Sequence, residues 1–156
     1  VATHAEIPPQ QATSPALALQ ASGSTLIPNT HDLMHWKIGN NGFSMGLSSK
    51  VPEAIGTTLK PWLSDWLQPH GTSLNDIQHW AIHPGGPRIL QECADALNLR
   101  NAQLTESRFV LEHHGNMSSA TILFVLNHMR ELGKIGPCVA LAFGPGLCAE
   151  VALMTL

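Results

Sequence analysis

The feature that most constrains the fold is a run of apolar residues near the end of the chain, Cys138–Phe143 ("CVALAF"). A strand without polar alternation has to be covered on both faces, as in sheets that carry helices on either side. A second short run, "WAI" at Trp80–Ile82, has the same character. Segments with helical spacing lie between the two runs. The sequence therefore predicts an α/β fold with a mixed β-sheet covered by helices.

The order of the remaining segments supports this architecture. Apolar or alternating stretches bounded by turn residues predict strands, and apolar residues three or four positions apart predict helices. The predicted strands cover residues 16–28, 77–83, 107–114, 137–143 and 148–156, a hairpin covers 35–49, and the predicted helices cover 52–67, 87–99 and 118–132. Pro61 predicts a kink or an early end of the first helix. Residues 1–14, which are polar and rich in proline, are expected to form a loop or an edge segment, and residues 15–156 one domain.

Composition narrows the classes of function. The net charge is -3, charged residues make up 12% of the chain and no basic cluster occurs, which argues against a nucleic-acid partner. No apolar run has the length needed to span a membrane, and the first twenty residues lack the pattern of a signal peptide. The three cysteines, an odd number without CxxC spacing, predict reduced thiols in a cytoplasmic protein. The chain starts at Val1 rather than at Met, as a fragment would.

Two polar residues follow predicted strands, at the carboxyl ends where sites form in α/β sheets. His83 comes directly after "WAI" and before Pro84-Gly85-Gly86, and Asn116 follows the segment 107–114. A histidine at a strand end is often only a hydrogen-bonded structural residue, and Asn116 is a plausible N-cap for the next helix. The glycine pair favours a site, because glycines allow a ligand to approach the backbone. Together, an imidazole and a carboxamide at neighbouring strand ends predict two N–H donors for one oxyanion.

Metal binding and thiol catalysis are the competing interpretations. His113 and His114 would face opposite sides of a strand, and His79 and His83 would lie about 13 Å apart along one, so neither pair favours a shared metal ion. None of the three cysteines has the exposed, electropositive setting that a thiolate nucleophile needs. No metal is therefore predicted, and the residues by themselves indicate an oxyanion half-site without a nucleophile.

Three motifs are similar to those of a known enzyme family. "WAIHPGGPRIL", "EHHGNMSSATILFVLNHM" and "AFGPGLCAEVALM" resemble, in this order and with family-like spacing, the carboxy-terminal motifs of type III polyketide synthases, the chalcone and stilbene synthase family. The resemblance covers residues 15–156 and implies the carboxy-terminal half of a thiolase-like fold. The β-ketoacyl synthases of the initiating type share that fold. In them Gln-Ala-Asn follows the histidine, whereas this chain has Pro-Gly-Gly, so the polyketide synthases match better.

The resemblance implies an acyltransferase that extends an acyl chain with malonyl-CoA and needs no further cofactor. His83 and Asn116 match the residues that bind the thioester carbonyl and stabilise the enolate formed by decarboxylation. His83 also matches the histidine that holds the nucleophilic cysteine as a thiolate. That cysteine motif and the basic segment that grips the coenzyme A phosphates are absent from this chain. The chain thus resembles the carboxy-terminal part of a longer synthase that is inactive alone.

The implied partners are malonyl-CoA, an acyl-CoA starter and the amino-terminal half of the same synthase, which would be a homodimer when complete. Around the substrate, Gly85 and Gly86 would let the pantetheine arm pass close to the backbone. Ser118 matches a serine near the catalytic centre. The loop Phe143-Gly144-Pro145-Gly146 matches the family's Gly-Phe-Gly-Pro-Gly loop, with Ala142 in place of the first glycine, so a slight change in that cavity wall is expected.

The resemblance also suggests a gate between the coenzyme A tunnel and the reaction chamber. Leu17 and Met45 match the two phenylalanines that often form this gate in the family, and Phe43 could supply an aromatic ring instead. Leucine and methionine are smaller or more flexible than phenylalanine, which predicts aliphatic rather than aromatic starters. In the alternative interpretation, Leu17 and Met45 are ordinary core residues.

Two hypotheses from different classes remain. In the first, the chain is a catalytic half-domain that becomes competent with its amino-terminal half. In the second, it is a non-catalytic thiolase-fold binding module, and a relative of the β-ketoacyl-ACP synthases is a further alternative. The presence of both His83 and Asn116 favours the first hypothesis.

Overall fold

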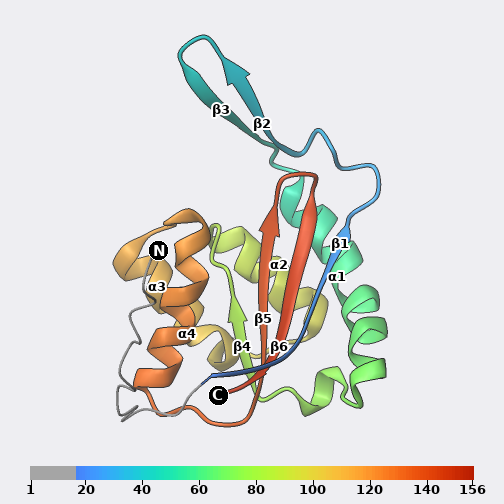
Figure 1. Cartoon of the computed structure of the whole chain (residues 1–156), viewed down its shortest axis with the longest axis vertical. Coiled ribbons are helices and arrows are strands. Elements are labelled where there is room, and N and C mark those ends of the chain that lie inside the picture. The colour runs from blue at the N-terminus through green and yellow to red at the C-terminus, as the bar shows by residue number, and fades with distance from the viewer. Residues whose placement is uncertain (1–16) are drawn as a thin grey trace, which may run out of the picture.

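The computed structural model describes residues 17–156, so the predicted loop or edge segment at residues 1–14 lies outside the described residues. A four-stranded sheet in the order β1-β6-β5-β4 forms the centre, and a two-stranded hairpin, β2-β3, projects from one end (Figure 1). The strands are β1 Ala18–Leu26, β2 Met34–Gly39, β3 Gly42–Leu47, β4 His79–Ile82, β5 Pro137–Gly144 and β6 Cys148–Thr155. The structure confirms the predicted hairpin and every predicted strand except the one at residues 107–114.

Helices cover both faces of the sheet. The α-helices are α1 Val51–Leu67, α2 Pro87–Leu97, α3 Thr105–His114 and α4 Thr121–Glu131, and the short 3-10 helices are η1 Gln68–His70, η2 Leu74–Asp76, η3 Asn101–Leu104 and η4 Ser118–Ala120. Helices α1 and α2 pack on one face, and α3 and α4 pack on the other (Figure 1). In the part of the chain that the structure describes, no helix combines the length and apolar character needed to cross a membrane.

Strand β5 shows why the apolar run needs two covers. It pairs with β4 in parallel and with β6 antiparallel, so it lies inside a mixed sheet. Its side chains alternate between two cores: Val139 and Leu141 pack with α1 and α2, whereas Cys138 and Ala140 pack with α3 and α4. All four are buried. The predicted mixed sheet covered by helices on both faces is therefore confirmed.

Helix α1 continues past Pro61, so the predicted early end is wrong. The buried side chains of α1 recur every fourth residue, at Ile55, Leu59, Leu63 and Leu67. Pro61 lies on the exposed side of the helix, where water can reach the carbonyl that loses its hydrogen bond. An interior proline costs about 3 kcal/mol. Burial of Leu63 and Leu67, at about 1.5–3 kcal/mol each, offsets this cost.

The predicted strand at 107–114 is wrong, because this segment belongs to helix α3. Its buried residues are Glu106, Ser107 and Val110, a spacing that places them on one face of a helix. Gly115 ends the helix with a left-handed φ of 69°, the conformation that glycine adopts without strain. From β4 onward the chain therefore forms a strand, three α-helices and two strands, instead of the predicted alternation.

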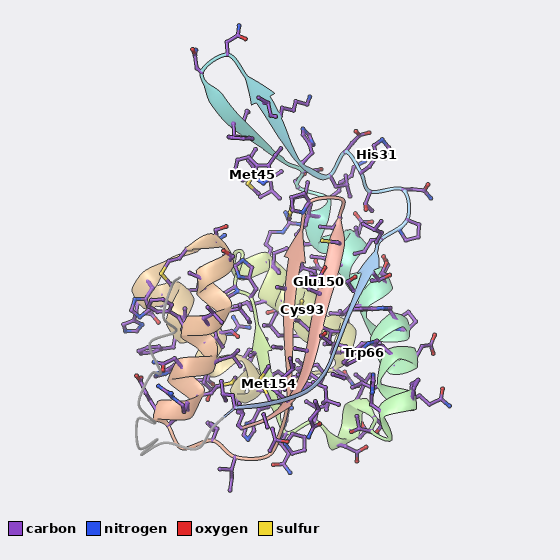
Figure 2. All side chains as sticks on the ribbon, viewed as in Figure 1. His31, Met45, Trp66, Cys93, Glu150 and Met154 are labelled. Carbon is purple, nitrogen blue, oxygen red and sulfur yellow. The ribbon has the colours of Figure 1, made fainter. Side chains whose placement is uncertain are left out.

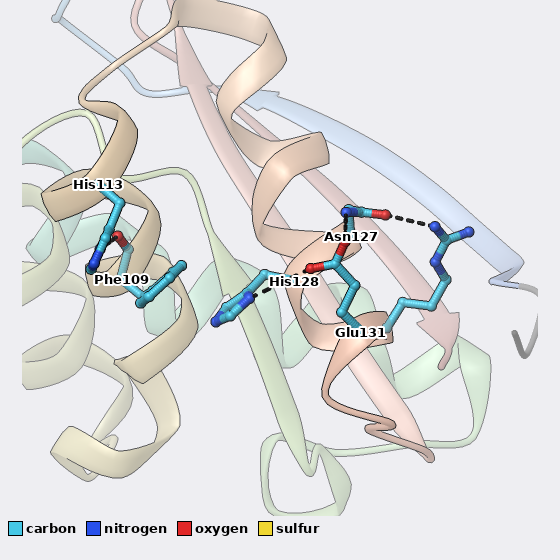
Figure 3. A network of polar contacts seen from close by, with 6 residues as sticks. Phe109, His113, Asn127, His128 and Glu131 are labelled. Carbon is cyan, nitrogen blue, oxygen red and sulfur yellow. Dashed lines mark hydrogen bonds and ion pairs between the residues drawn. The ribbon is translucent and has the colours of Figure 1, made fainter.

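Helices α3 and α4 contact each other through a stack of three rings. The ring of Phe109 lies between His113 and His128, with ring centroids 3.9 and 4.1 Å apart (Figure 3). Polar side chains of α4 are hydrogen-bonded to one another beside this stack, namely Asn127, Arg130 and Glu131. The stack holds the two helices on either side of the loop that contains Asn116.

The β2-β3 hairpin has one apolar face. The cross-strand register places six apolar side chains on it: Met34, Trp36, Ile38, Phe43, Met45 and Leu47. Met34 is buried, whereas the other five are between 48% and 83% exposed. The rings of Trp36 and Phe43 meet edge to face at 6.4 Å. We call these six side chains the apolar face of the hairpin; the opposite face carries His35, Lys37, Ser44 and glycines.

Candidate active site

His83 lies directly after β4, at its carboxyl end, as predicted. Its backbone N–H donates to the Leu141 carbonyl at 2.8 Å, so pairing with β5 extends to this residue. The Gly85 N–H then donates back to the His83 carbonyl at 2.9 Å, which closes a tight turn. The side chain is half-buried. Burial lowers the pKa of His83 below its ordinary value of 6.5, so at neutral pH the ring is uncharged and has one N–H donor.

Gly85, two residues after His83, leaves one edge of its ring uncovered. A Cβ atom at Gly85 would lie 3.7 Å from Cδ2 and 3.8 Å from Nε2 of His83. Such a methyl group would fit without a clash but would cover the ring. A Cβ atom at Gly86 would meet nothing within 4 Å, and helix α2 begins at the next residue. Gly85 therefore keeps this approach to the imidazole open, whereas a side chain at Gly86 would not cover the ring.

Asn116 reaches the same turn from a different kind of element. It follows the end of helix α3, so the predicted neighbouring strand ends are wrong. Its Nδ2 donates to the Gly85 carbonyl at 3.2 Å, and its Oδ1 accepts from the Ser118 N–H at 2.9 Å. Exchanging the two amide ends would set Oδ1 against the Gly85 oxygen, so these bonds fix the orientation of the carboxamide. Nδ2 also carries a second N–H that can point toward a ligand.

The loop around Asn116 is held in a strained conformation. Ser118 has a φ of 60°, which is rare for a residue other than glycine and costs on the order of 1–3 kcal/mol. The buried hydroxyl of Thr121 accepts from the Met117 N–H at 2.8 Å and donates to the Ser118 carbonyl at 2.9 Å. Strain of this kind persists where surrounding bonds fix it, and it often occurs at functional sites.

Gly85 is the residue that brings His83 and Asn116 together. Its carbonyl accepts from the Asn116 amide, and a Cβ atom on it would lie within 4 Å of the His83 ring. One donor comes from the end of a strand and the other from the end of a helix. Two N–H donors that converge from rigid elements can stabilise negative charge that develops on one oxygen.

One contact near the site was missed by the sequence analysis. The Ile82 N–H donates to the buried hydroxyl of Ser107 at 3.1 Å and so attaches β4 to α3 one residue before His83. The helical spacing of Ser107 with Val110 and the glycine at position 115 are the signals that could have revealed it.

The loop Phe143–Gly146 lies at the same end of the sheet. Strand β5 runs into it from Leu141, whose carbonyl accepts from His83. Gly146 has a φ of 130°, which residues with a side chain rarely adopt, and its N–H donates to the Met34 carbonyl at 3.0 Å. The loop therefore connects the His83 end of the sheet with the base of the hairpin.

The two residues predicted to form a gate lie far apart. Leu17 precedes the first residue of β1, which pairs with Thr155, whereas the hairpin with Met45 follows the opposite end of β1, beside Cys148. The nine residues of β1 span roughly 30 Å. The structure therefore does not bring Leu17 and Met45 together. Met45 lies near the base of the hairpin (Figure 2), and Phe43 is on the same face.

The three cysteines are free thiols. Burial, with a smaller contribution from the Glu92 charge, raises the pKa of Cys93 to about 12. Burial also raises the pKa of Cys138 to about 12. Thiols with such pKa values stay protonated, so neither of these two has the exposed, electropositive setting that a thiolate nucleophile needs. Cys148, at the start of β6, is half-buried.

Two surface hollows lie away from this turn. One, of about 640 Å³, is lined by residues of α2, η3 and α3, and the other, of about 720 Å³, by residues of α1 and the segment after it. Neither is lined by His83 or Asn116. Within residues 17–156, no three histidine, cysteine or acidic side chains are grouped so that they could hold a metal ion.

Comparison with known protein families shows to which family the chain belongs. The family model of the C-terminal domain of chalcone and stilbene synthases matches residues 18–156. The chain belongs to this family, that of the type III polyketide synthases, and has its thiolase-like fold.

Individual relatives agree with this assignment. The 1,3,6,8-tetrahydroxynaphthalene synthase of Streptomyces peucetius subsp. caesius is 38% identical over 137 residues, which are 86% of this chain and 36% of that protein. The alpha-pyrone synthesis polyketide synthase-like Pks18 of Mycobacterium tuberculosis is 33% identical over 144 residues, 90% of this chain and 37% of that protein. The crystal structure of PKS-I from the brown alga Ectocarpus siliculosus superposes with a TM-score of 0.83 at 28% identity, and the match covers 94% of this chain and 41% of that one. The chain thus spans less than half the length of these relatives.

Proposed function

We propose that this chain is the part of a type III polyketide synthase that decarboxylates malonyl-CoA and directs the product onto an acyl-enzyme. The observation that carries the proposal is the turn at Gly85, which accepts a hydrogen bond from Asn116 and lies beside the His83 ring. The names of two relatives, a tetrahydroxynaphthalene synthase and a polyketide synthase-like protein, support the class of reaction.

In the proposed first step, the thioester carbonyl oxygen of malonyl-CoA accepts hydrogen bonds from Asn116 Nδ2 and from the His83 ring. The bond between the α-carbon and the carboxylate breaks, carbon dioxide leaves, and the electron pair forms an enolate. Negative charge then accumulates on the bound oxygen, so the two donors stabilise the transition state more than the substrate. The step uses coenzyme A thioesters as substrates and needs no resident cofactor.

In the second step, the enolate carbon attacks the carbonyl of an acyl group held on a cysteine. A carbon–carbon bond forms, the carbon–sulfur bond breaks, and the cysteine leaves as a thiolate. The product is a β-ketoacyl-CoA that is two carbons longer. The cysteine belongs to the proposed partner, the amino-terminal half of the same synthase. The uncharged ring of His83 can accept the thiol proton, which gives an imidazolium–thiolate pair.

Further residues are proposed to border the substrate. The pantetheine arm would pass the open pair Gly85-Gly86, and the reaction chamber would lie between Ser118 and the loop Phe143–Gly146. Met45, with Phe43 beside it, would line the passage for the starter. A flexible thioether adapts to irregular aliphatic chains, so we propose an aliphatic acyl-CoA or malonyl-CoA as the starter.

We also propose that the complete synthase is a cytoplasmic homodimer. The free thiols support a reducing compartment. The dimer rests on the resemblance to the family, and size-exclusion chromatography of the complete synthase with light scattering tests it.

The test of this function is a chimaera in which the chain replaces the corresponding C-terminal domain of the Streptomyces tetrahydroxynaphthalene synthase. We expect the chimaera to release carbon dioxide from labelled malonyl-CoA, and His83→Ala and Asn116→Ala to lose this activity. Asn127→Ala, on the exposed side of α4, is the control and should keep it. A folded but inactive chimaera would favour the non-catalytic module, and activity with acyl-carrier-protein substrates alone would favour a relative of the β-ketoacyl-ACP synthases.

The gene gives a second test that does not depend on folding of the chimaera. A reading frame that continues upstream of Val1 and encodes a cysteine at the start of an apolar helix supports the catalytic proposal. A reading frame without such a cysteine contradicts it and favours the binding module.

A further inference from the structure

We propose that Ser107 is a positioning residue that sets how His83 and Asn116 lie relative to each other; this inference rests on the function proposed above. Ser107 is fully buried in helix α3, and its hydroxyl accepts from the Ile82 N–H at 3.1 Å. Ile82 is the residue before His83. The serine therefore acts on the strand that carries the histidine and on the helix that leads to the asparagine.

The Ile82 N–H needs this acceptor because β4 is an edge strand of the sheet. Backbone N–H groups alternate between the two sides of a strand. The His83 N–H points toward β5, where it meets the Leu141 carbonyl, so the Ile82 N–H points outward. Ser107 of helix α3 lies at that outer edge, and a buried N–H without an acceptor would be unfavourable. The Ser107 hydroxyl supplies the acceptor that a neighbouring strand would otherwise provide.

Two hydrogen bonds then close a frame around His83. One joins Ile82 to Ser107, and the other joins Gly85 to Asn116. On the strand side, the two bonds are three residues apart, at Ile82 and Gly85, and on the helix side nine residues apart, at Ser107 and Asn116. His83 lies between Ile82 and Gly85, so the two bonds border the segment that carries it. We call this the β4–α3 frame.

The start of α3 is anchored at a second point. The buried carboxylate of Glu106 pairs with Lys134 at 3.1 Å, which attaches the helix to the segment before β5. With this end fixed, the helix acts as a rigid spacer that ends at His114, two residues before Asn116. Without the Ser107 hydroxyl, β4 and α3 lose one of the two bonds of the frame, and the Asn116 amide shifts relative to the His83 ring.

The test compares Ser107→Thr with Ser107→Val in the chimaera, because these side chains have the same shape and differ by the hydroxyl group. We expect Ser107→Val and Ser107→Ala to lower kcat for malonyl-CoA decarboxylation by about 10- to 100-fold, the effect of a misplaced catalytic group, with KM changed less than kcat. Ser107→Thr should recover most of kcat. Thr57→Val removes a hydroxyl that bonds backbone carbonyls of α1 and is the control that should keep the parental kcat.

A structural measurement on the 156-residue chain accompanies the kinetics. In Ser107→Val, the nuclear magnetic resonance signals of the Asn116 side-chain amide should shift, and the Ile82 amide should exchange with solvent faster. Ser107→Thr should show neither change, whereas a general loss of stability would affect amides throughout the sheet.

The outcomes separate this inference from the function on which it rests. If Ser107→Val and Ser107→Thr have the same kcat, while Asn116→Ala lacks activity, the positioning role is wrong and the proposed function stands. If Asn116→Ala decarboxylates at the parental rate, the proposed function is wrong. The amide signals then still decide whether the frame exists, because an unchanged Asn116 signal in Ser107→Val contradicts it.

Discussion

The turn at Gly85 and the apolar face of the hairpin lie at the same end of the sheet. They differ in whether their groups have partners within the chain. At the turn, the Gly85 carbonyl, both ends of the Asn116 amide and the Ile82 N–H take part in hydrogen bonds within the described residues. On the apolar face of the hairpin, five of the six side chains are exposed. Hydrogen bonds within the chain thus orient the polar donors, whereas the apolar face of the hairpin at the same end of the sheet stays exposed to solvent.

This difference distinguishes two ways of building a site. Hydrogen bonds are short and directional, so a local frame of strand and helix is enough to orient an amide and an imidazole. An apolar surface is stabilised in proportion to the area that is buried, so it needs a large contact. Contiguous exposed apolar patches usually mark an interaction or ligand surface. The chain spans 36% and 37% of the length of two of its relatives. The apolar face of the hairpin can therefore be covered by other residues than those that orient the two donors.

The largest expected effect concerns the chain alone. Incubated with labelled malonyl-CoA and an acyl-CoA starter, it should form no polyketide, because ordered donors without a cysteine nucleophile cannot hold the growing acyl group. Chromatography of the labelled products measures this. Product formation that persists after replacement of Cys93, Cys138 and Cys148 by serine would show that the chain needs no partner that carries the nucleophilic cysteine. The contrast between an ordered turn and an incomplete apolar face would then lose its functional meaning.

The next effect concerns the turn itself. In the chimaera, His83→Ala or Asn116→Ala should reduce malonyl-CoA decarboxylation by about 10²–10³-fold or more, the usual loss for one oxyanion donor. Circular dichroism should stay unchanged, since both residues lie at the ends of elements rather than in the cores. A parental rate in either variant would mean that the assigned role is incorrect.

Two substitutions of apolar residues test how differently the sheet core and the hairpin are buried. Leu141→Ala, in the fully buried centre of β5, should lower the free energy of unfolding by about 2–5 kcal/mol. Ile38→Ala, on the hairpin and 83% exposed, should change it by less than about 0.5 kcal/mol in the isolated chain. Urea unfolding of both variants gives the values. Equal losses would show that the hairpin is covered within the chain itself.

The smallest expected effect concerns the proposed role of the hairpin in selecting the starter. Met45→Phe in the chimaera should raise kcat/KM for a coumaroyl-type CoA relative to a medium-chain acyl-CoA by about 2- to 10-fold, because a ring offers an aromatic starter a surface to stack on. Leu17→Phe is the matched control and should produce no shift, since Leu17 lies at the other end of β1. The proposed passage is wrong if the parent already prefers the aromatic starter or if Met45→Phe changes nothing.

Much of the fold could be predicted because its signals are local. The run Cys138–Phe143 has no polar alternation, and a strand of that kind requires two covering layers. The Asn41-Gly42 pair predicts the hairpin, and the structure has Asn41 in its turn and Gly42, with a φ of 119°, as the first residue of β3. In each case a few neighbouring residues determine the backbone.

Helix α3 was mistaken for a strand because its local signals conflict. Phe109 and Val110 favour a strand by type, whereas the paired histidines before Gly115 are typical of a helix end. The decisive contacts are distant in sequence: Val110 packs with α4 and the sheet, and Ser107 bonds Ile82, 25 residues earlier. Tertiary contacts of this kind override residue preference.

The residues of the candidate site could be singled out from the sequence, but their geometry could not. His83 follows an apolar strand and precedes a Pro-Gly-Gly turn, and Asn116 directly follows Gly115. Their meeting at Gly85 depends on a hydrogen bond between residues 31 positions apart, which no local pattern contains. The separation of Leu17 from Met45 likewise depends on the antiparallel pairing of β1 with β6.

That pairing also has a consequence for the synthesis of the protein on the ribosome. Strand β1 joins the sheet only through β6, and Gln20 and Thr155, which are hydrogen-bonded across this pair, lie 135 residues apart. At a translation rate of 5–20 residues per second, β1 emerges about 7 to 27 s before its partner. During that interval the backbone edge of β1 that later pairs with β6 is open to other nascent chains. The sheet is thus completed only after β6 has been synthesised, and chaperone contact with β1 would matter most before that point.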